Sequence, residues 1–264
     1  VAMHVVPTTD AGELPLDLLA GAVRNRHDPH AAYTRLVCLE NTHGGTGGKV
    51  VRPEYMAQVK SWAHANDLAV HLDGARVFNA AVALGVDVKT ITQHVDSVQF
   101  CLSKGLSAPV GSILAGSAEL IAKARRLRKM IGGGMRQAGI IAAAGMVALN
   151  EMVDRLAEDH VNAQILAAGL AQIPGIAVNP QNVHTDIVVF DITDGRTAGD
   201  VGDTADETIE RVGLKVAWRC GRNRVCANAL RVDRHAARLL DAVVTDLNHH
   251  GHAAGGRLHA GFGH

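Results

Sequence analysis

Residues 97–111 read SVQFCLSKGLSAPVG, in which an apolar run from Val98 to Leu102 ends in Ser-Lys-Gly. The run predicts a buried strand, and the glycine that follows Lys104 allows a sharp backbone turn where the strand ends. A lysine at such a place costs free energy unless its ammonium group is paired, neutralised or covalently used. Two interpretations stay open: Lys104 either extends its ammonium group into solvent or binds an aldehyde cofactor as a Schiff base.

Segments on both sides of this stretch alternate between short apolar strands and helices. Strands are predicted at residues 1–9, 34–39, 68–72, 95–102 and 110–115, and helices at 14–22, 53–67 and 77–84. The run 34–39 is almost continuously apolar, which is typical of a parallel strand covered on both faces. The loop between the last two strands is too short for a parallel crossover, so that pair can run antiparallel. This order predicts an α/β fold with a mainly parallel sheet.

The order of predicted helices and strands changes after residue 116. A strongly basic helix is predicted at 118–129, and three glycines at 132–134 separate it from a long helical region at 137–173. Beyond it, strands are predicted at 187–192, 214–218 and 224–230, with helices at 197–212 and 234–247. This second part has the pattern of a smaller α+β domain.

These patterns predict three regions. The first is a large domain at residues 1–150, incomplete at its N-terminus, and the second is a small C-terminal α+β domain at 151–248 with a long connecting helix. The third is a tail at 249–264, whose glycine and histidine content predicts disorder rather than a metal site.

The composition excludes several classes of partner. The 264-residue chain carries 26 Lys and Arg against 26 Asp and Glu, so no net charge attracts nucleic acid or an anionic membrane. Its four cysteines form no Cys-x-x-Cys pair, and Cys38 and Cys101 lie in apolar runs, as buried, reduced thiols do. No apolar run is long enough to span a membrane, and no signal peptide is visible. We expect a cytoplasmic protein without a nucleic-acid, membrane or metal partner.

A carboxylate accompanies the lysine. Asp73 ends one predicted buried strand and Lys104 ends the next, so the two are expected along one edge of the sheet. Pyridoxal phosphate needs a lysine for its aldehyde, a carboxylate for its ring nitrogen and groups that hold its phosphate. Arg76, three residues after Asp73, is a candidate for the ring hydroxyl or a substrate carboxylate, although an Asp-x-x-Arg pattern also fits an ordinary helix start.

Four motifs carry a family resemblance. They are LENTH at 39–43, HLDGARVFNAAVALG at 71–85, DSVQFCLSKGLSAPVGS at 96–112 and RRLRKMIGGGMRQAG at 125–139. Together they resemble the low-specificity L-threonine aldolases, which are fold-type I (aspartate aminotransferase-like) pyridoxal-phosphate enzymes. The similarity extends from near Val1 to about Asn179, and more loosely to Leu247. It implies a large domain with a mainly parallel sheet and a smaller α+β C-terminal domain.

The resemblance implies roles for residues near the sheet edge. Lys104 would carry the cofactor, Asp73 would pair with its ring nitrogen, and Arg76 would contact the ring hydroxyl or the substrate carboxylate. His30 resembles a histidine near the hydroxyl of the substrate's side chain and is the candidate general base, although a loop histidine in water also explains it. His43 lies closer to the strand ends, and no role is assigned to it.

Further roles fall outside this edge. The triple glycine, with Lys129 and Arg136 beside it, is suited to a phosphate, and the resemblance implies that this loop reaches the site of a neighbouring subunit. The expected assembly is therefore a homo-oligomer, either a dimer or a tetramer. Arg224 resembles an arginine that binds the substrate's α-carboxylate, but Ala227 and Asn228 replace the Thr-His of that pattern, and Arg222 is an alternative.

The implied reaction is retro-aldol cleavage of L-threonine or L-allo-threonine, a small β-hydroxy amino acid, to glycine and acetaldehyde. Members of the family also have a preceding segment that supplies a phosphate-binding turn and a histidine stacked on the ring. Without that segment, cofactor affinity and activity are expected to be impaired. Two alternatives stay open: a β-eliminating lyase with the same Asp-Lys pair, and a non-catalytic truncated protein.

Overall fold

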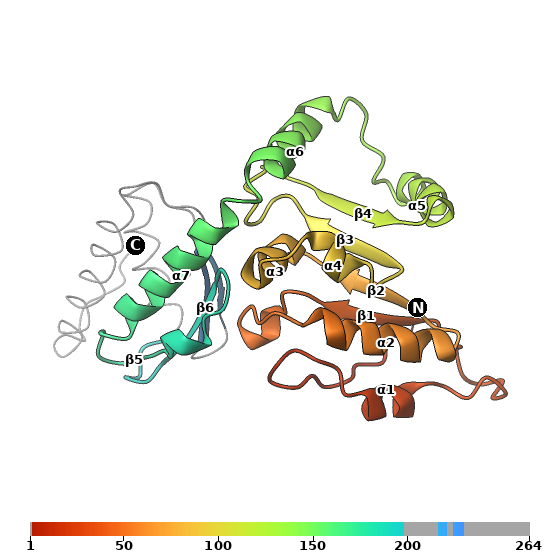
Figure 1. Cartoon of the computed structure of the whole chain (residues 1–264), viewed down its shortest axis with the longest axis horizontal. Coiled ribbons are helices and arrows are strands. Elements are labelled where there is room, and N and C mark those ends of the chain that lie inside the picture. The colour runs from red at the N-terminus through yellow and green to blue at the C-terminus, as the bar shows by residue number, and fades with distance from the viewer. Residues whose placement is uncertain (1, 198–215, 221–223, 230–264) are drawn as a thin grey trace, which may run out of the picture. The chain divides into compact units, whose positions relative to one another are not determined.

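The computed structural model describes residues 2–197, 216–220 and 224–229, the last two segments by their backbone alone. The chain divides into two compact units, residues 1–158 and 159–264, and each contains its own sheet (Figure 1). The helices expected at 197–212 and 234–247 and the tail at 249–264 lie outside the described residues.

The sheet of the first unit has four strands in the order β1-β2-β3-β4. They are β1 (Leu36–Glu40), β2 (Ala69–Asp73), β3 (Ser97–Cys101) and β4 (Ser112–Gly116). The first three are parallel, and β4 runs antiparallel to β3. The predicted α/β order and the antiparallel last pair are thus confirmed.

Eight helical segments accompany this sheet. They are α1 (Leu16–Ala22), the 3₁₀ turn η1 (Gly44–Thr46), α2 (Pro53–Ala65), α3 (Val77–Leu84), α4 (Val88–Thr92), α5 (Ala118–Met130), α6 (Gly139–Glu151) and α7 (Leu156–Leu170), which continues into the second unit. The short helix α4 was not expected from the sequence. Its Asp87 cap accepts a hydrogen bond from the N–H of Lys89 at 2.7 Å, which is a local signal for a helix start.

One face of the sheet holds the main core. Side chains alternate along a strand, so Val37, Leu39, Val70, Leu72 and Val98 all point to the same face and are buried there. Helices α2 and α3 cover this face with another set of buried residues: Met56, Val59, Ala63, Val77, Ala80 and Ala81. Figure 1 shows α2 running along β1 and β2.

The opposite face is open, which corrects the expectation that residues 34–39 form a strand covered on both faces. Leu36 is 49% exposed, and Cys38 on the same side of β1 is also exposed rather than buried. Their Cα partners in β2 are Ala69, which is exposed, and His71, which is half-buried. An apolar run does not distinguish one covered face from two, because burial depends on what packs against the second face.

Two further expectations were wrong. Residues 2–9 form no strand: Pro7 has no N–H for a ladder, and the hydroxyl of Thr9 accepts hydrogen bonds from Ala11 and Glu13 in a turn. The helical region at 137–173 is two helices, α6 and α7, separated at residues 152–155. This break lets Leu156 enter a small second core with Leu102, Leu106, Ala108 and Ala148.

The second unit contains a four-stranded antiparallel sheet in the order β5-β6-β8-β7. Its elements are β5 (Ile176–Ala177), the 3₁₀ turn η2 (Pro180–Asn182), β6 (Ile187–Ile192), β7 (Val216–Cys220) and β8 (Arg224–Ala229). Val188 and Phe190 of β6 and Ala163 and Ala167 of α7 are buried. The strands expected at 187–192, 214–218 and 224–230 are therefore confirmed within two residues.

Asp96 ties the start of β3 to its neighbours. Its Oδ2 accepts the N–H of Val70 at 2.7 Å, and Nε2 of His64 lies 3.1 Å from both carboxylate oxygens. Burial opposes the charge of this carboxylate, but the N–H of Val70 and the imidazole of His64 outweigh it and hold the pKa of Asp96 below its usual value.

We predict that Asp96→Asn lowers the free energy of unfolding at pH 7 by about 1–2 kcal/mol. The contribution of a carboxylate with a lowered pKa is present above the pKa of the unfolded state and is lost as the pH falls through the folded pKa. Urea unfolding at pH 7 and at pH 3 should therefore give a large difference between wild type and variant at pH 7 and a small one at pH 3. Equal differences at both pH values would contradict this.

Candidate functional site

The carboxyl ends of β1 and β2 are held side by side. Glu40 and Asp73 are Cα partners in the parallel ladder, and the N–H of Asn41 donates to the carbonyl oxygen of Asp73 at 2.9 Å. The chain leaves β2 through Gly74, where an added Cβ would lie 2.8 Å from Cγ2 of Val98 and 3.0 Å from the carbonyl oxygen of Gln99. Only glycine fits this approach, so the turn after Asp73 follows directly from the sequence.

Asp73 presents its carboxylate at this edge. The side chain is exposed, and Oδ1 accepts the N–H of Ala75 at 3.1 Å. Its negative charge reaches two neighbours on the open face. Although Cys38 retains an exposed surface, the protein atoms around its thiol partly desolvate it and raise its pKa, and Asp73 raises it further. Partial burial lowers the pKa of His71, and Asp73 opposes that change. The thiol of Cys38 is therefore kept neutral.

Lys104 follows the neighbouring strand β3, in a turn fixed by its backbone. The N–H of Ser107 donates to the carbonyl oxygen of Lys104 at 2.8 Å, and Ala108 donates to that of Leu102 at 3.0 Å. An added Cβ on Gly105 would lie 2.7 Å from Cδ2 of the buried Leu156, so a larger residue here would have to displace that side chain. Lys104 is half-buried. The structure thus places Asp73 and Lys104 after neighbouring parallel strands, as the strand order predicts.

Arg76 is the residue that immediately precedes helix α3, three residues after Asp73. Its side chain is half-buried. Arg76 thus lies on the short connection between β2 and α3, three residues along the chain from Asp73.

A pocket of about 250 Å³ opens beside Asp73. It is lined by Thr8, Gly12, Leu14, Cys38, Leu39, Glu40, His43 and Asp73. Lys104 is not among these residues, so the joint access of Asp73 and Lys104 to one ligand stays a prediction. The segment before α1 forms one wall through Thr8, Gly12 and Leu14. Tyr55 of α2 holds this segment, because its hydroxyl donates to the carbonyl oxygen of Leu14 at 2.6 Å and accepts the N–H of Leu14 at 2.8 Å. Burial, with the charge of Glu13, raises the pKa of Tyr55 to about 12.

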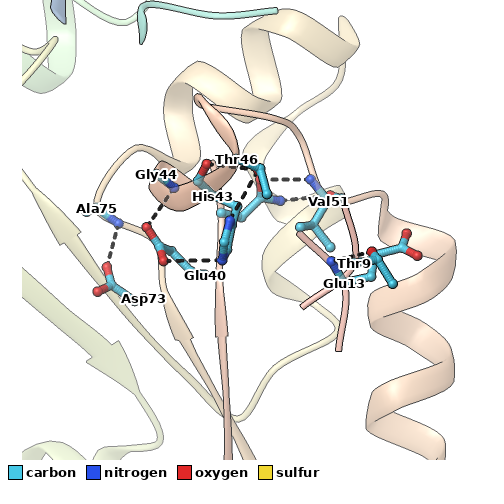
Figure 2. A network of polar contacts seen from close by, with 10 residues as sticks. Thr9, Glu13, Glu40, His43, Gly44, Thr46, Val51, Asp73 and Ala75 are labelled. Atoms are coloured by element: carbon cyan, nitrogen blue, oxygen red, sulfur yellow. Dashed lines mark hydrogen bonds and ion pairs between the residues drawn. The ribbon is translucent and has the colours of Figure 1, made fainter. Parts of the chain in front are cut away.

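The loop after β1 forms another wall of the pocket (Figure 2). Oε1 of Glu40 accepts the N–H of Gly44 at 2.9 Å, and Oε2 lies 3.8 Å from Nε2 of His43. The buried side chain of Asn41 closes the loop, because its Nδ2 donates to the carbonyl oxygen of Val51 at 2.8 Å and its Oδ1 accepts the N–H of Val51 at 3.2 Å. No role for Glu40 or Asn41 was expected, although a carboxylate directly after a buried strand is the same signal that singled out Asp73.

Other predicted site residues lie elsewhere. His30 is in a turn, where its N–H donates to Asp28 at 2.9 Å and its side chain is 91% exposed, so the structure does not bring it into the pocket. Arg136 is exposed between α5 and α6, after the triple glycine. Arg224 begins β8, whose side chains are outside the described part, and Arg222 lies outside the described residues.

The described residues are compatible with an aldehyde cofactor. Asp73 ends β2, Arg76 follows it before α3, and Lys104 follows the neighbouring strand β3, so a carboxylate, an arginine and a lysine of the kinds that pyridoxal phosphate uses lie after adjacent strands. Within the described ranges, no three His, Cys, Asp or Glu side chains are grouped to hold a metal ion. In the same part of the chain no helix has the length and apolarity to cross a membrane.

Comparison with known proteins places the chain in a family. A family model described as β-eliminating lyase matches residues 1–193, which include both strand ends and the turn with Lys104. The chain belongs to the β-eliminating lyase family. It is 51% identical over 161 residues to the low specificity L-threonine aldolase of Escherichia coli, covering 61% of this chain and 47% of that one.

Solved structures show the fold of this β-eliminating lyase family member. A threonine aldolase from Leishmania major superposes with a TM-score of 0.64 at 17% identity, covering 90% of this chain and 69% of that one. A PLP-dependent aminotransferase from Streptococcus suis superposes with a TM-score of 0.63 at 16% identity, covering 92% and 62%. The fold is therefore that of the fold-type I pyridoxal-phosphate enzymes, as the resemblance implied. The chain spans about half the length of the curated relatives it matches.

We predict that Asn41→Ala destabilises the first unit by about 1–3 kcal/mol, because the buried N–H and carbonyl groups of Val51 lose their partner. Asn66→Ala is the matched control, since Asn66 is exposed and its side chain donates to the carbonyl oxygen of Trp62 in α2. Urea unfolding measures both variants. A loss for Asn41→Ala no larger than that for Asn66→Ala would show that the loop closes without this side chain.

Proposed function

We propose that this chain is the cofactor-binding part of a pyridoxal-phosphate-dependent threonine aldolase. Such an enzyme cleaves L-threonine or L-allo-threonine to glycine and acetaldehyde. The observation that carries the proposal is the position of Asp73 and Lys104 at the carboxyl ends of neighbouring parallel strands. Ligands of open α/β sheets bind at this edge. The likeness to the Escherichia coli aldolase supports the choice of substrate.

Three residues would hold the cofactor. Lys104 would bind its aldehyde carbon, and Asp73 would keep its ring nitrogen protonated through an ion pair. Arg76 would contact the ring hydroxyl or the substrate carboxylate. Pyridoxal phosphate, when bound, supplies an electron sink for the pair released at Cα as the bond to Cβ breaks. The fixed turns at Gly74 and Gly105 would hold the carboxylate and the ammonium group in place without reorganisation.

The remaining roles would come from other segments. His30 would accept the proton of the substrate's β-hydroxyl group; its side chain is exposed, and its Nδ1 lies 3.3 Å from Oδ1 of Asp28. Arg224 would bind the α-carboxylate, and Arg136 would bind phosphate in the site of a neighbouring subunit. A β-eliminating lyase is the second candidate, because the matching family carries that description.

We expect added pyridoxal phosphate to give the purified chain the visible absorption band of a lysine-bound cofactor. Lys104→Ala should abolish the band, Asp73→Asn should weaken cofactor binding by about tenfold or more, and Lys123→Ala on exposed α5 should change neither. A band that persists in Lys104→Ala, or no band in wild type, would contradict the proposal.

Product analysis separates the two reactions. With threonine, glycine and acetaldehyde support the aldolase, whereas 2-oxobutyrate and ammonia support the β-eliminating lyase. A chain that binds the cofactor and releases neither set of products would support the non-catalytic alternative.

We also propose that the protein is a cytoplasmic homo-oligomer, either a dimer or a tetramer. Around α5 and α6, large apolar side chains are between 56% and 87% exposed, namely Leu127, Met130, Ile131, Met135 and Ile140. Apolar groups gathered in this way are typical of an interface. The same region carries Arg136, which is consistent with a residue contributed to a neighbouring site.

Ile140→Lys should weaken self-association by about tenfold or more, because the ammonium group would be placed in an apolar interface. The control is Val5→Lys, since Val5 is 86% exposed and belongs to the segment before α1. Sedimentation over a range of concentrations measures both. An unchanged association constant for Ile140→Lys would place the interface elsewhere.

A further inference from the structure

Helix α3 carries one polar residue among apolar ones. Its sequence is VFNAAVAL, and Asn79 lies in its first turn, three residues after Arg76 and six after Asp73. The side chain of Asn79 is buried, with the residue only 2% exposed. Asparagine is a weak helix former, and burying its amide costs free energy that an apolar side chain of similar size does not cost. Packing alone therefore favours an apolar residue at this position.

The amide of Asn79 lies against the turn that carries Lys104. An added Cβ on Gly105 would lie 3.4 Å from Oδ1 and 3.6 Å from Nδ2 of Asn79, and 2.7 Å from Cδ2 of Leu156. Gly105 is itself buried and directly follows Lys104. The backbone next to the lysine thus lies beside both the first turn of α3 and the side chain of Leu156.

Apolar contacts join α3 to the same turn. Phe78 and Val82, one helical turn apart, pack on the small core that contains Leu102 and Leu106. These two leucines flank Lys104 in the chain. Apolar packing brings the helix and the turn together but has no preferred direction, whereas the hydrogen bonds of a buried amide require defined angles. The amide is therefore the group in this contact that can fix the orientation of the turn.

Hydrogen bonds within the turn connect its orientation to the lysine. The N–H of Ser107 donates to the carbonyl oxygen of Lys104 at 2.8 Å, and the N–H of Ala108 donates to that of Leu102 at 3.0 Å. Gly105 lies inside the loop that these two bonds close. A rotation of the backbone at Gly105 would strain both bonds and change the direction in which the side chain of Lys104 leaves the turn.

We propose that Asn79 is a positioning residue, whose amide fixes the turn at Gly105 to the start of α3. It thereby sets where the amine of Lys104 lies relative to the carboxylate of Asp73. Asp73 ends β2, and a connection of three residues leads from it into α3. The lysine is thus positioned from the same stretch of chain that carries the carboxylate. This inference rests on the proposed function of Asp73 and Lys104 in binding pyridoxal phosphate.

Amide exchange tests the contact without cofactor. In Asn79→Leu, which replaces the amide by an apolar side chain of similar size, the N–H groups of Ser107 and Ala108 should exchange about tenfold faster, because the turn opens locally. The N–H of Val70, which belongs to the main core, should change less. Val59→Ala is the control, since Val59 is buried in the main core and not in the small core at the turn. Equal acceleration of all three amides in Asn79→Leu would show that Asn79 has no local role at the turn.

Chemical labelling then tests the link to Lys104. Pyridoxal phosphate followed by borohydride fixes the cofactor on the lysine it reacts with, and peptide mass spectrometry gives the label at Lys104 relative to that at exposed Lys123. Asn79→Leu should lower this ratio by about tenfold, since a misplaced amine reacts more slowly with a bound aldehyde. Val59→Ala lowers stability without touching the turn and should lower the ratio less. An unchanged ratio in Asn79→Leu, or the same loss in both variants, would overturn the proposal.

A second variant covers the case in which Asn79→Leu does not fold. Asn79→Ala also removes the amide, adds no bulk and places a stronger helix former in α3. It should show the same faster exchange at Ser107 and Ala108 and the same loss of label at Lys104. A folded Asn79→Ala with wild-type exchange and labelling would contradict the positioning role.

The two proposals fail in different ways. If pyridoxal phosphate is not fixed at Lys104 of the wild-type chain, the proposed function fails and the positioning of Lys104 fails with it, while the exchange rates still decide whether Asn79 holds the turn. If the wild-type chain is labelled at Lys104 and Asn79→Leu behaves like Val59→Ala, the proposed function stands and only the positioning role is wrong.

Discussion

The parallel register between β1 and β2 is the constraint on which the candidate site depends. It makes Glu40 and Asp73 neighbours and lets the N–H of Asn41 extend the ladder by one bond beyond the strands. Parallel strands deliver their carboxyl ends to one edge, so the loops that follow them must share that edge. A slip of β2 by one residue would turn Asp73 to the covered face, beside Val37 and Leu39 of β1, where an unpaired charge is costly. The core on one face therefore determines which side chains reach the site on the other.

The turns that follow β2 and β3 are closely packed at their glycines and position the residues of the site that lie after the strands. Gly74 lies against Val98 and Gln99, and Gly105 lies against Leu156. Both glycines are packed against neighbouring residues, so the backbone on which Asp73 and Lys104 sit lies against the core. Asn41 serves the loop after β1 in a comparable way, since a single buried amide satisfies both backbone groups of Val51.

Much of this could be predicted because it follows from local patterns. Asp73 and Lys104 each end an apolar run next to a glycine, and the order of strands and helices gave a parallel sheet with an antiparallel end. The open face could not be predicted, because Leu36 and Cys38 would fit a covered face equally well. The strand expected at residues 2–9 was wrong because alternating apolar residues do not supply a pairing partner, and Pro7 cannot donate to one. Gly12 and Gly45 both lie against the side chain of His43. Gly12 belongs to a separate segment, and no spacing in the sequence signals its contact with His43.

The hydroxyl of Tyr55 has a consequence for how the pocket behaves over time. It bonds both backbone groups of Leu14, and the raised pKa of Tyr55 keeps its proton in place even in strongly alkaline solution. Because Tyr55 belongs to α2, the segment that carries Gly12 is anchored to a helix of the main core as well as to the loop after β1, from which Nζ of Lys49 donates to the carbonyl oxygen of Asp10 at 2.8 Å. The amide hydrogen exchange of this pocket wall is therefore expected to follow that of α2.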